Sequence, residues 1–295
     1  MTVYFPLYYK DFKCIADKCT HSCCIGWEIS VDESTMEKYR ELGREDILCH
    51  ISDGSIELCD NLRCPFLCDE GLCRIISEFG DEYTSVICRE HPRFYHSVMG
   101  RCEGGIGLSC EEAARIILTS DSYDEFYSIE KDADPAEETD FDSIRYRGEI
   151  YRILKDNSLG FREKIAKIKD SFSLSDQDIY SDSINSALSD MEYLNEEHKD
   201  LFEVGISDEN VENYAIYERF FAYLILRHMS IASSFDNMRA RIGFSLVLLS
   251  ILEGAAVKGK LDRNGIFRFA RTISEEIEYS EENTSTIIFE IECLI

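Results

Sequence analysis

The sequence has little positive charge, no long apolar run and no basic leader, and each absence excludes a class of protein. Its 295 residues include 31 Lys and Arg against 58 Asp and Glu, a formal net charge of -27. This excess argues against nucleic acid or an anionic membrane as a partner and favours a basic partner, although solubility alone also explains an acidic surface. No basic segment with a long apolar stretch begins the chain, so we expect no secretory signal and a cytoplasmic location.

The longest apolar run extends from Ile242 to Leu252. It is shorter than the roughly 18 residues that a membrane-spanning helix needs, and Arg239, Arg241 and Glu253 flank it. We therefore predict a buried core helix there. A hydrophobic content of 44% indicates a globular protein, and the absence of a repeat of fixed period argues against a solenoid.

Cysteine is abundant, and its distribution is uneven. The chain has 13 cysteines, and Cys14, Cys19, Cys23 and Cys24 fall within eleven residues. An odd number of thiols in a reducing compartment favours metal ligation over a disulfide framework. Thiolates at such short spacings can converge on one soft metal ion or iron-sulfur cluster. Buried cysteines that only fill a core are common singly but improbable for four so close together.

Eight cysteines are the predicted metal ligands: Cys14, Cys19, Cys23, Cys24, Cys64, Cys73, Cys88 and Cys110. Neighbouring side chains usually diverge, so one thiol of an adjacent pair can ligate while the other packs or binds a second centre. Cys110 comes just before a predicted helix, where a thiolate is stabilised, and is either a ligand or a reactive thiol. The remaining five cysteines are not assigned to the site. Nearby imidazoles at His21 and His91 could complete a mixed site, and Arg89 and Arg93 could hold a carboxylate or simply make surface pairs.

A glycine-rich stretch from Glu103 to Gly107 has the spacing of a nucleotide- or S-adenosylmethionine-binding turn. Such a turn normally follows an apolar strand in a βαβ unit, and the residues before this stretch make a poor central strand. We therefore favour a glycine-rich hairpin turn. No cofactor-binding residue is assigned.

The predicted fold class is mainly α: an N-terminal cysteine-rich metal-cluster domain with little β structure, followed by an α-helical domain. Residues 121 to 142 carry ten acids and one lysine, which is typical of a solvated linker. The predicted divisions are a cysteine-rich domain at 1–118, an acidic linker at 119–142 and a helical domain at 143–295. Within the last, the pattern predicts helices over 143–157, 160–171, 176–203, 208–234, 236–258, 262–280 and 284–294.

Several blocks of residues together resemble the bacterial flagellin lysine N-methylase family and, more distantly, cysteine-cluster proteins described as zinc or iron chelators. They cover residues 8 to 118, and they are Tyr9-Lys-Asp-Phe-Lys-Cys14, Cys19-x-x-x-Cys23-Cys24-x-x-Trp27, Cys64-Pro-Phe-Leu, Gly71-Leu-Cys73-Arg-Ile, Cys88-Arg-x-x-Pro92-Arg93 and Ser109-Cys110-x-Glu112-Ala-Ala-Arg115. The sequence departs from the family pattern at His91, where tyrosine is usual, and at Glu111, where proline is usual. Neither departure removes a thiol.

The resemblance implies S-adenosylmethionine-dependent methylation of lysine ε-amines on a protein substrate, with flagellin expected, and a [4Fe-4S] cluster in the thiol region, with zinc as the alternative. Lysine attacks a methyl sulfonium only as the neutral amine, and the acidic charge of the chain would attract a cationic side chain. Nothing in the sequence selects a catalytic base. The competing hypotheses are a non-enzymatic iron-sulfur or zinc module that docks another protein, and a redox protein.

Overall fold

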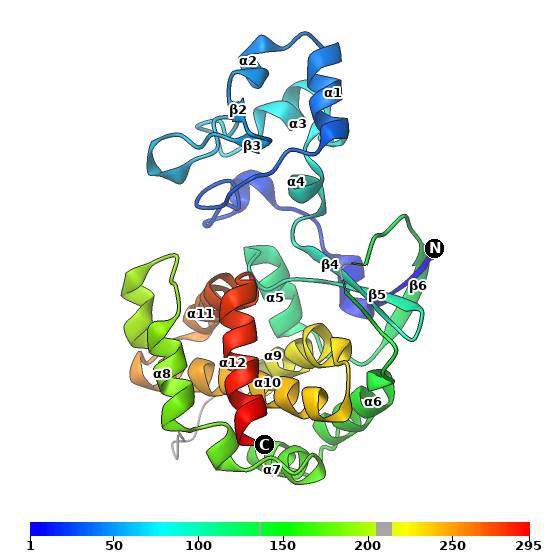
Figure 1. The fold of residues 1–295 in the computed structure, drawn as a ribbon, viewed down its shortest axis with the longest axis vertical. Helices are drawn as coiled ribbons and strands as arrows, with labels where there is room; N and C mark the ends of the chain where they lie inside the picture. The colour runs from blue at the N-terminus through cyan, green and yellow to red at the C-terminus, as the bar shows by residue number, and fades with distance from the viewer. Residues whose placement is uncertain (136, 205–213) are drawn as a thin grey trace. The chain divides into compact units, whose positions relative to one another are not determined.

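The computed structural model describes residues 1–135, 137–204 and 214–295. The chain divides into two compact units (Figure 1). Unit 1 comprises Met1–Phe12, Phe94–Ser109 and Ala113–Ile295, and unit 2 comprises Lys13–Arg93 and Cys110–Glu112. The chain therefore enters unit 1 first, builds unit 2 and then returns. The predicted domains at 1–118, 119–142 and 143–295 stay a prediction.

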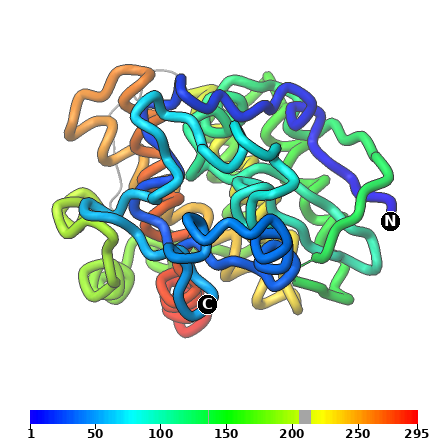
Figure 2. Tube along the Cα trace, turned by 90° about the horizontal axis from the view of Figure 1, so that it is seen from above, coloured from blue at the N-terminus to red at the C-terminus, as the bar shows by residue number. Residues whose placement is uncertain are grey.

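Unit 1 contains a five-stranded mixed sheet. Its strand order is β6 (Phe126–Glu130), β1 (Thr2–Pro6), β5 (Arg101–Ile106), β4 (Arg93–Val98) and β7 (Glu137–Thr139). Strand β1 runs parallel to β5 and antiparallel to β6, and β4 runs parallel to β7. Figure 2 shows the dark-blue start of the chain beside the green segment that contains β6. The sheet thus joins residues that are more than a hundred positions apart in the sequence.

Helices predominate as predicted, but the rest of the predicted fold class is wrong. The expected N-terminal region with little β structure instead supplies β1, β4 and β5 to the sheet of unit 1, and the expected linker supplies β6 and β7. The glycines of β5 hid this strand from sequence patterns because glycine normally weakens strands. A Cβ at Gly104 would lie 2.5 Å from the Phe5 ring, and one at Gly105 would overlap the Phe94 ring. The sheet needs glycine there so that these rings can pack on its backbone.

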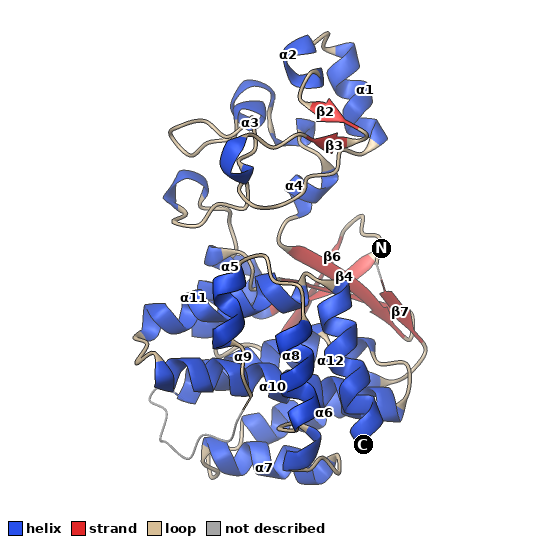
Figure 3. Cartoon of the chain, turned by 60° about the vertical axis from the view of Figure 1, so that its left-hand side comes forward, coloured by secondary structure: helices blue, strands red, loops and turns tan. Residues whose placement is uncertain are grey.

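The helices of unit 1 surround one long apolar helix, α10 (Phe235–Lys258), which packs against α9, α11 and α12. Residues 242 to 252 of α10 are all buried, which confirms the predicted core helix. Among the described residues, α10 is also the only helix that could cross a membrane by length and composition, and 83% of its apolar window is buried. Figure 3 shows the other helices of this unit, which are α5 (Glu111–Thr119), α6 (Ser143–Leu154), α7 (Phe161–Ser171), α8 (Asp182–Asp190), α9 (Tyr214–Arg227), α11 (Arg263–Ile273) and α12 (Glu281–Leu294).

The predicted helix over 176–203 is broken into three pieces. A 3-10 turn at Asp176–Asp178 precedes α8, and a second at Glu196–Leu201 follows it. Ser181 starts α8 by accepting a hydrogen bond from the backbone N–H of Ile184, and the chain becomes extended at Met191. Serine competes for backbone donors in this way and favours helix starts over interiors. The first part of the predicted helix over 208–234 lies outside the described residues.

The end of the predicted helix over 262–280 is a π-helix, Ser274–Glu278. All five of its residues are buried, including Glu275, Glu276 and Glu278. These three carboxylates have different partners: Glu275 pairs with Arg271, Glu276 with His198 at 2.6 Å, and Glu278 with His228 at 2.6 Å. The remaining 3-10 helices of the described chain are Leu7–Asp11, Ala16–Lys18, Asp60–Leu62, Asp81–Tyr83 and Met229–Ile231.

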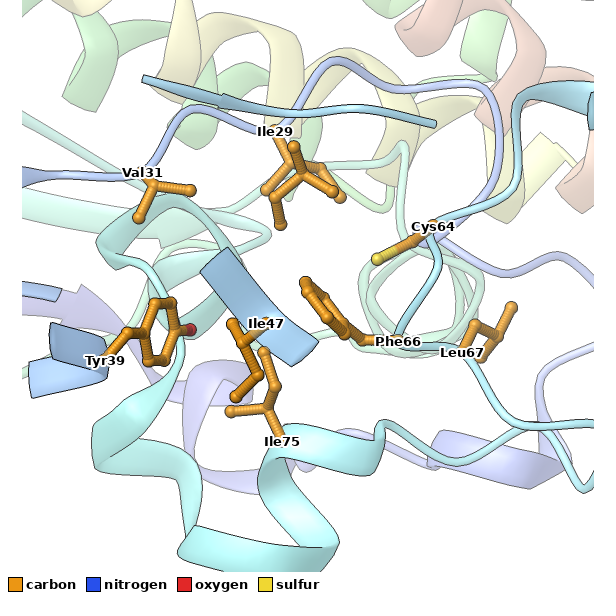
Figure 4. Close-up of a cluster of buried hydrophobic side chains, with 9 residues drawn as sticks. Ile29, Val31, Tyr39, Ile47, Cys64, Phe66, Leu67 and Ile75 are labelled. Atoms are coloured by element: carbon orange, nitrogen blue, oxygen red, sulfur yellow. The ribbon is translucent and has the colours of Figure 1, made fainter. Parts of the chain in front are cut away.

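Unit 2 is built from short elements around a small core. Its helices are α1 (Glu33–Glu41), α2 (Glu45–Leu48), α3 (Arg74–Phe79) and α4 (Val86–Glu90), and its hairpin joins β2 (Ile51–Ser52) to β3 (Ser55–Ile56). The core includes Tyr39, Ile47, Phe66 and Ile75, each at most 4% exposed, as Figure 4 shows. Asp32 caps α1 by accepting from the backbone N–H of Thr35, and its other carboxylate oxygen accepts from that of Val86 at 2.9 Å. This one carboxylate therefore ties α1 to α4.

Candidate functional site

All eight predicted ligand cysteines lie in unit 2. Seven belong to Lys13–Arg93, and Cys110 belongs to the short segment Cys110–Glu112 that joins the same unit. None of the eight forms a disulfide. The structure thus gathers into one compact unit thiols that span almost a hundred residues of sequence.

The carboxylate of Glu111 brings Cys110 to the first thiol loop. Its Oε2 accepts hydrogen bonds from the backbone N–H of Thr20 at 2.8 Å and of His21 at 3.0 Å, and from the Thr20 hydroxyl at 2.8 Å. Three donors on one carboxylate oxygen fix the loop against the start of α5. The position where the family usually has proline therefore holds a residue with a structural role of its own.

One group of thiols comprises Cys14, Cys19, Cys23 and Cys110. Partial burial, and then the nearby charges of Cys110, Glu111 and Cys14, raise the pKa of Cys19 to about 12. The hydrogen bond to Cys24 is the largest influence on Cys23 and raises its pKa, and the charges of Cys110 and Cys14 act in the same direction. Cys19 and Cys23 therefore each lie within electrostatic reach of Cys14 and Cys110.

A second group comprises Cys24, Cys64, Cys73 and Cys88. Burial, and then the charges of Cys24, Cys73 and Cys88, raise the pKa of Cys64 to about 12. Partial burial and the charges of Cys24 and Cys73 also raise the pKa of Cys88. Hydrogen bonding from Cys23 lowers the pKa of Cys24 to about 7, with further help from Ser22 and Arg63. The adjacent pair Cys23 and Cys24 thus stands at the division between the two groups.

The second group borders the hydrophobic core of unit 2. Cys64 is 6% exposed and belongs to that core, while Cys24 and Cys73 pack against it partly buried. Figure 4 shows the Cys64 sulfur among the same side chains as Phe66. These thiols therefore contribute apolar packing as well as sulfur donors.

The metal-cluster domain predicted as part of the fold class is not present in this structure. In residues 1–135, 137–204 and 214–295, no group of three or more His, Cys, Asp or Glu side chains is arranged to hold a metal ion. The thiols themselves are donors of the kind that soft metal ions and iron-sulfur clusters take. No chemical step is derived through a metal cluster here.

Arg89 and Arg93, to which the sequence gave no definite role, make hydrogen bonds to nearby backbone carbonyls. Arg89 donates to the backbone carbonyl of Thr84 at 3.0 Å, and Arg93 donates to that of Arg89 at 3.2 Å, so both arginines stabilise the exit from α4. Cys102 is buried in the sheet of unit 1, and Cys293 is exposed on α12.

The stretch around Glu103 lies in strand β5 and does not form a turn. Glu103 is fully buried on β5, and both of its oxygens accept from Arg147 of α6, at 2.6 and 2.8 Å. Arg101 and His96 lie 3.0 and 3.4 Å from the same carboxylate. Burial alone would raise the pKa of Glu103, but the charge and hydrogen bonds of Arg147, with His96, hold it well below its usual range. The predicted glycine-rich hairpin turn over Glu103–Gly107 is therefore wrong: Glu103, Gly104 and Gly105 lie in strand β5, and the turn before that strand is at Met99 and Gly100.

A second buried polar network was not visible in the sequence. Glu278 of the π-helix is fully buried and accepts from the Tyr223 hydroxyl at 3.0 Å, with His228 Nε2 at 2.6 Å and Arg227 Nε at 3.3 Å. Burial opposes ionisation, yet Arg227 and His228 outweigh it and lower the pKa of Glu278 to about 2. Tyr223 also accepts from the backbone N–H of Leu108 at 3.3 Å. The partners come from α9 and the π-helix, and only their helical spacing could have hinted at the network.

Three curated proteins have sequences related to this chain over part of its length. It is 29% identical over 131 residues to the flagellar biosynthetic protein FliU of Salmonella muenchen, a match that covers 40% of this chain and 78% of that protein. It is equally similar to the lysine-N-methylases of Salmonella choleraesuis and Salmonella typhimurium, but there the match covers 33% of each relative. No protein-family profile and no solved structure matches the chain. The curated relatives confirm the predicted resemblance.

Proposed function

Because this chain is related to the flagellin lysine N-methylase family, we propose that it transfers the methyl group of S-adenosylmethionine to the ε-amine of lysine side chains in a protein, with flagellin as the substrate. The observation that carries the proposal is the 29% identity to proteins named lysine-N-methylase. The name of the FliU relative supports a flagellar substrate.

The charge of the chain agrees with the proposal. A formal net charge of -27 attracts a lysine-bearing protein and disfavours nucleic acid or an anionic membrane. The transfer itself needs the substrate lysine as a neutral amine, aligned with the sulfonium methyl and its sulfur. The nitrogen–carbon bond forms as the carbon–sulfur bond breaks, S-adenosylhomocysteine leaves, and the surplus amine proton passes to an acceptor.

A metal role for the eight thiols belongs to the same proposal. The donor set of Cys14, Cys19, Cys23, Cys24, Cys64, Cys73, Cys88 and Cys110 suits a [4Fe-4S] cluster or zinc by its chemistry, and none of these cysteines forms a disulfide. Anaerobically purified protein should then contain iron with acid-labile sulfide, or zinc, by elemental analysis. Anaerobically purified protein that contains neither iron nor zinc would refute the metal part of the proposal and leave methyl transfer open.

The direct test is mass spectrometry of flagellin after incubation with the purified chain and S-adenosylmethionine, and of flagellin from cells with and without the gene. Methyl-mass increments on lysine that depend on this chain are expected. The competing reading, a thiol-rich module that docks another protein without catalysis, predicts no increments and no binding of S-adenosylmethionine in calorimetry.

A further inference from the structure

Two buried polar atoms at the packing of α7, α9 and α10 have no hydrogen-bond partner within the described part of the chain. They are the hydroxyl of Tyr217, a fully buried residue of α9, and Oε1 of Glu253, a residue of α10 that is 5% exposed. Buried polar groups in native proteins are almost always paired, so each such atom calls for a ligand, a water or a special role.

The two atoms belong to one cluster. Glu253 lies close enough for its charge to raise the pKa of Tyr217 and of Tyr180, in each case after the larger effect of burial. The other oxygen of Glu253 accepts a hydrogen bond from Arg162 Nη1 at 2.8 Å. One side of the carboxylate therefore already holds a cation, and the other side is unsatisfied near two phenols.

The surroundings of the cluster are aromatic and open to solvent at one end. The Phe161 ring lies 5.6 Å from the Tyr214 ring and 6.4 Å from the Tyr217 ring, measured between centroids. The side chain of Arg162 is 44% exposed, whereas that of Glu253 is only 6% exposed. The bound guanidinium therefore reaches the buried carboxylate from the solvent side.

Aromatic faces beside a buried carboxylate and phenol oxygens are the groups that recognise alkylammonium ions, through cation–π attraction and charge-assisted hydrogen bonds. We infer that Glu253 and Tyr217, with the Phe161 ring beside them, form a binding site for an alkylammonium group of the lysine or methyl-lysine class, and that Arg162 occupies the carboxylate until such a ligand displaces it. Only the identification of the ligand as the methyl-acceptor lysine rests on the proposed function.

The test is calorimetric titration of the whole chain with Nα-acetyl-lysine amide and with its Nε-trimethyl form, without S-adenosylmethionine or flagellin. Glu253→Gln removes the charge but keeps the shape, and should weaken binding at least about tenfold, the loss expected for one charge-assisted hydrogen bond. Arg162→Ala removes the resident cation and should strengthen binding. Glu203→Gln is the matched control, because Glu203 pairs with Lys258 at 2.5 Å on the surface and is 62% exposed, and it should bind as the wild type does.

No binding by the wild-type chain, equal binding by Glu253→Gln, or unchanged or weaker binding by Arg162→Ala would each overturn the inference. Circular dichroism checks that the variants fold. If Glu253→Gln does not fold, Tyr217→Phe, which removes only the unpartnered hydroxyl, takes its place. Weaker binding by this variant would support the inference, and unchanged binding would overturn it. Binding without any methylation of flagellin would refute the proposed function and keep this site, whereas full methylation by Glu253→Gln would keep the proposed function and refute the identification of the bound ligand as the acceptor lysine.

Discussion

Glu103 should be among the residues on which the stability of unit 1 depends most. Its fully buried carboxylate holds Arg147 by two hydrogen bonds, with Arg101 and His96 beside it. Glu103→Gln keeps the shape of the side chain but leaves two arginines facing one another without a counter-charge. The substitution therefore tests the charge of Glu103 and not its volume.

The magnitude follows from the geometry. At an effective dielectric constant of about 20, unit charges about 3 Å apart attract by about 5–6 kcal/mol. Removing one partner of a buried pair typically costs about 3–5 kcal/mol, because the other charge stays buried and unpaired. We expect a loss in this range for Glu103→Gln. Arg147→Met should cost less, because Glu103 would still have Arg101 at 3.0 Å.

Urea unfolding followed by circular dichroism measures the effect, since most helices belong to unit 1. Trp27 is the only tryptophan and lies in unit 2, so its fluorescence follows that unit separately. Lys258→Met is the control, because its pair with Glu203 is exposed on both sides and should contribute at most about 1 kcal/mol. A loss for Glu103→Gln no larger than that of this control would refute the reasoning.

Three further substitutions test other parts of the fold. Gly105→Ala would push a Cβ into the Phe94 ring and should lower the free energy of unfolding by about 1–3 kcal/mol in urea titrations. Asp32→Ala removes the cap of α1 and the acceptor for Val86, and should cost about 1–2 kcal/mol, read from Trp27 fluorescence. The pKa of Glu278 is lowered from 4.5 to about 2, so the stability that it contributes is complete above pH 4.5 and is lost as the pH falls towards 2. Unfolding of a Glu278→Gln variant should therefore depend less on pH in that window than unfolding of the wild type.

The helices could be predicted wherever their signal was local. The apolar run in α10 and the spacing in α6, α7 and α12 gave helices close to those observed, because burial of one face repeats within a few residues. The sheet could not be predicted in the same way. Strand β5 carries two adjacent glycines that are explained only by rings from β1 and β4, and its parallel neighbour β1 is about a hundred residues away.

The candidate site, too, could be predicted only where its sequence signal was local. The short spacings among Cys14, Cys19 and Cys23 made the thiol region recognisable, and the structure places these thiols in one unit. What they do not reveal is the carboxylate of Glu111, which brings Cys110 to Thr20 from ninety residues away. Glu103 was noticed for a glycine pattern, whereas its role depends on Arg147, a partner that no local motif marks.

Long-range pairing leaves the buried polar groups of unit 1 without a local sequence signal. Loops with closely spaced cysteines keep a readable sequence pattern because their residues act over short distances. Buried pairs such as Glu278 with His228, or Glu253 with Arg162, can be exchanged for other pairs of similar shape during divergence, since each needs only complementary charge at one point in space. Substitutions at Glu253 and Arg162 therefore test the proposed alkylammonium site in unit 1 without changing any thiol of unit 2.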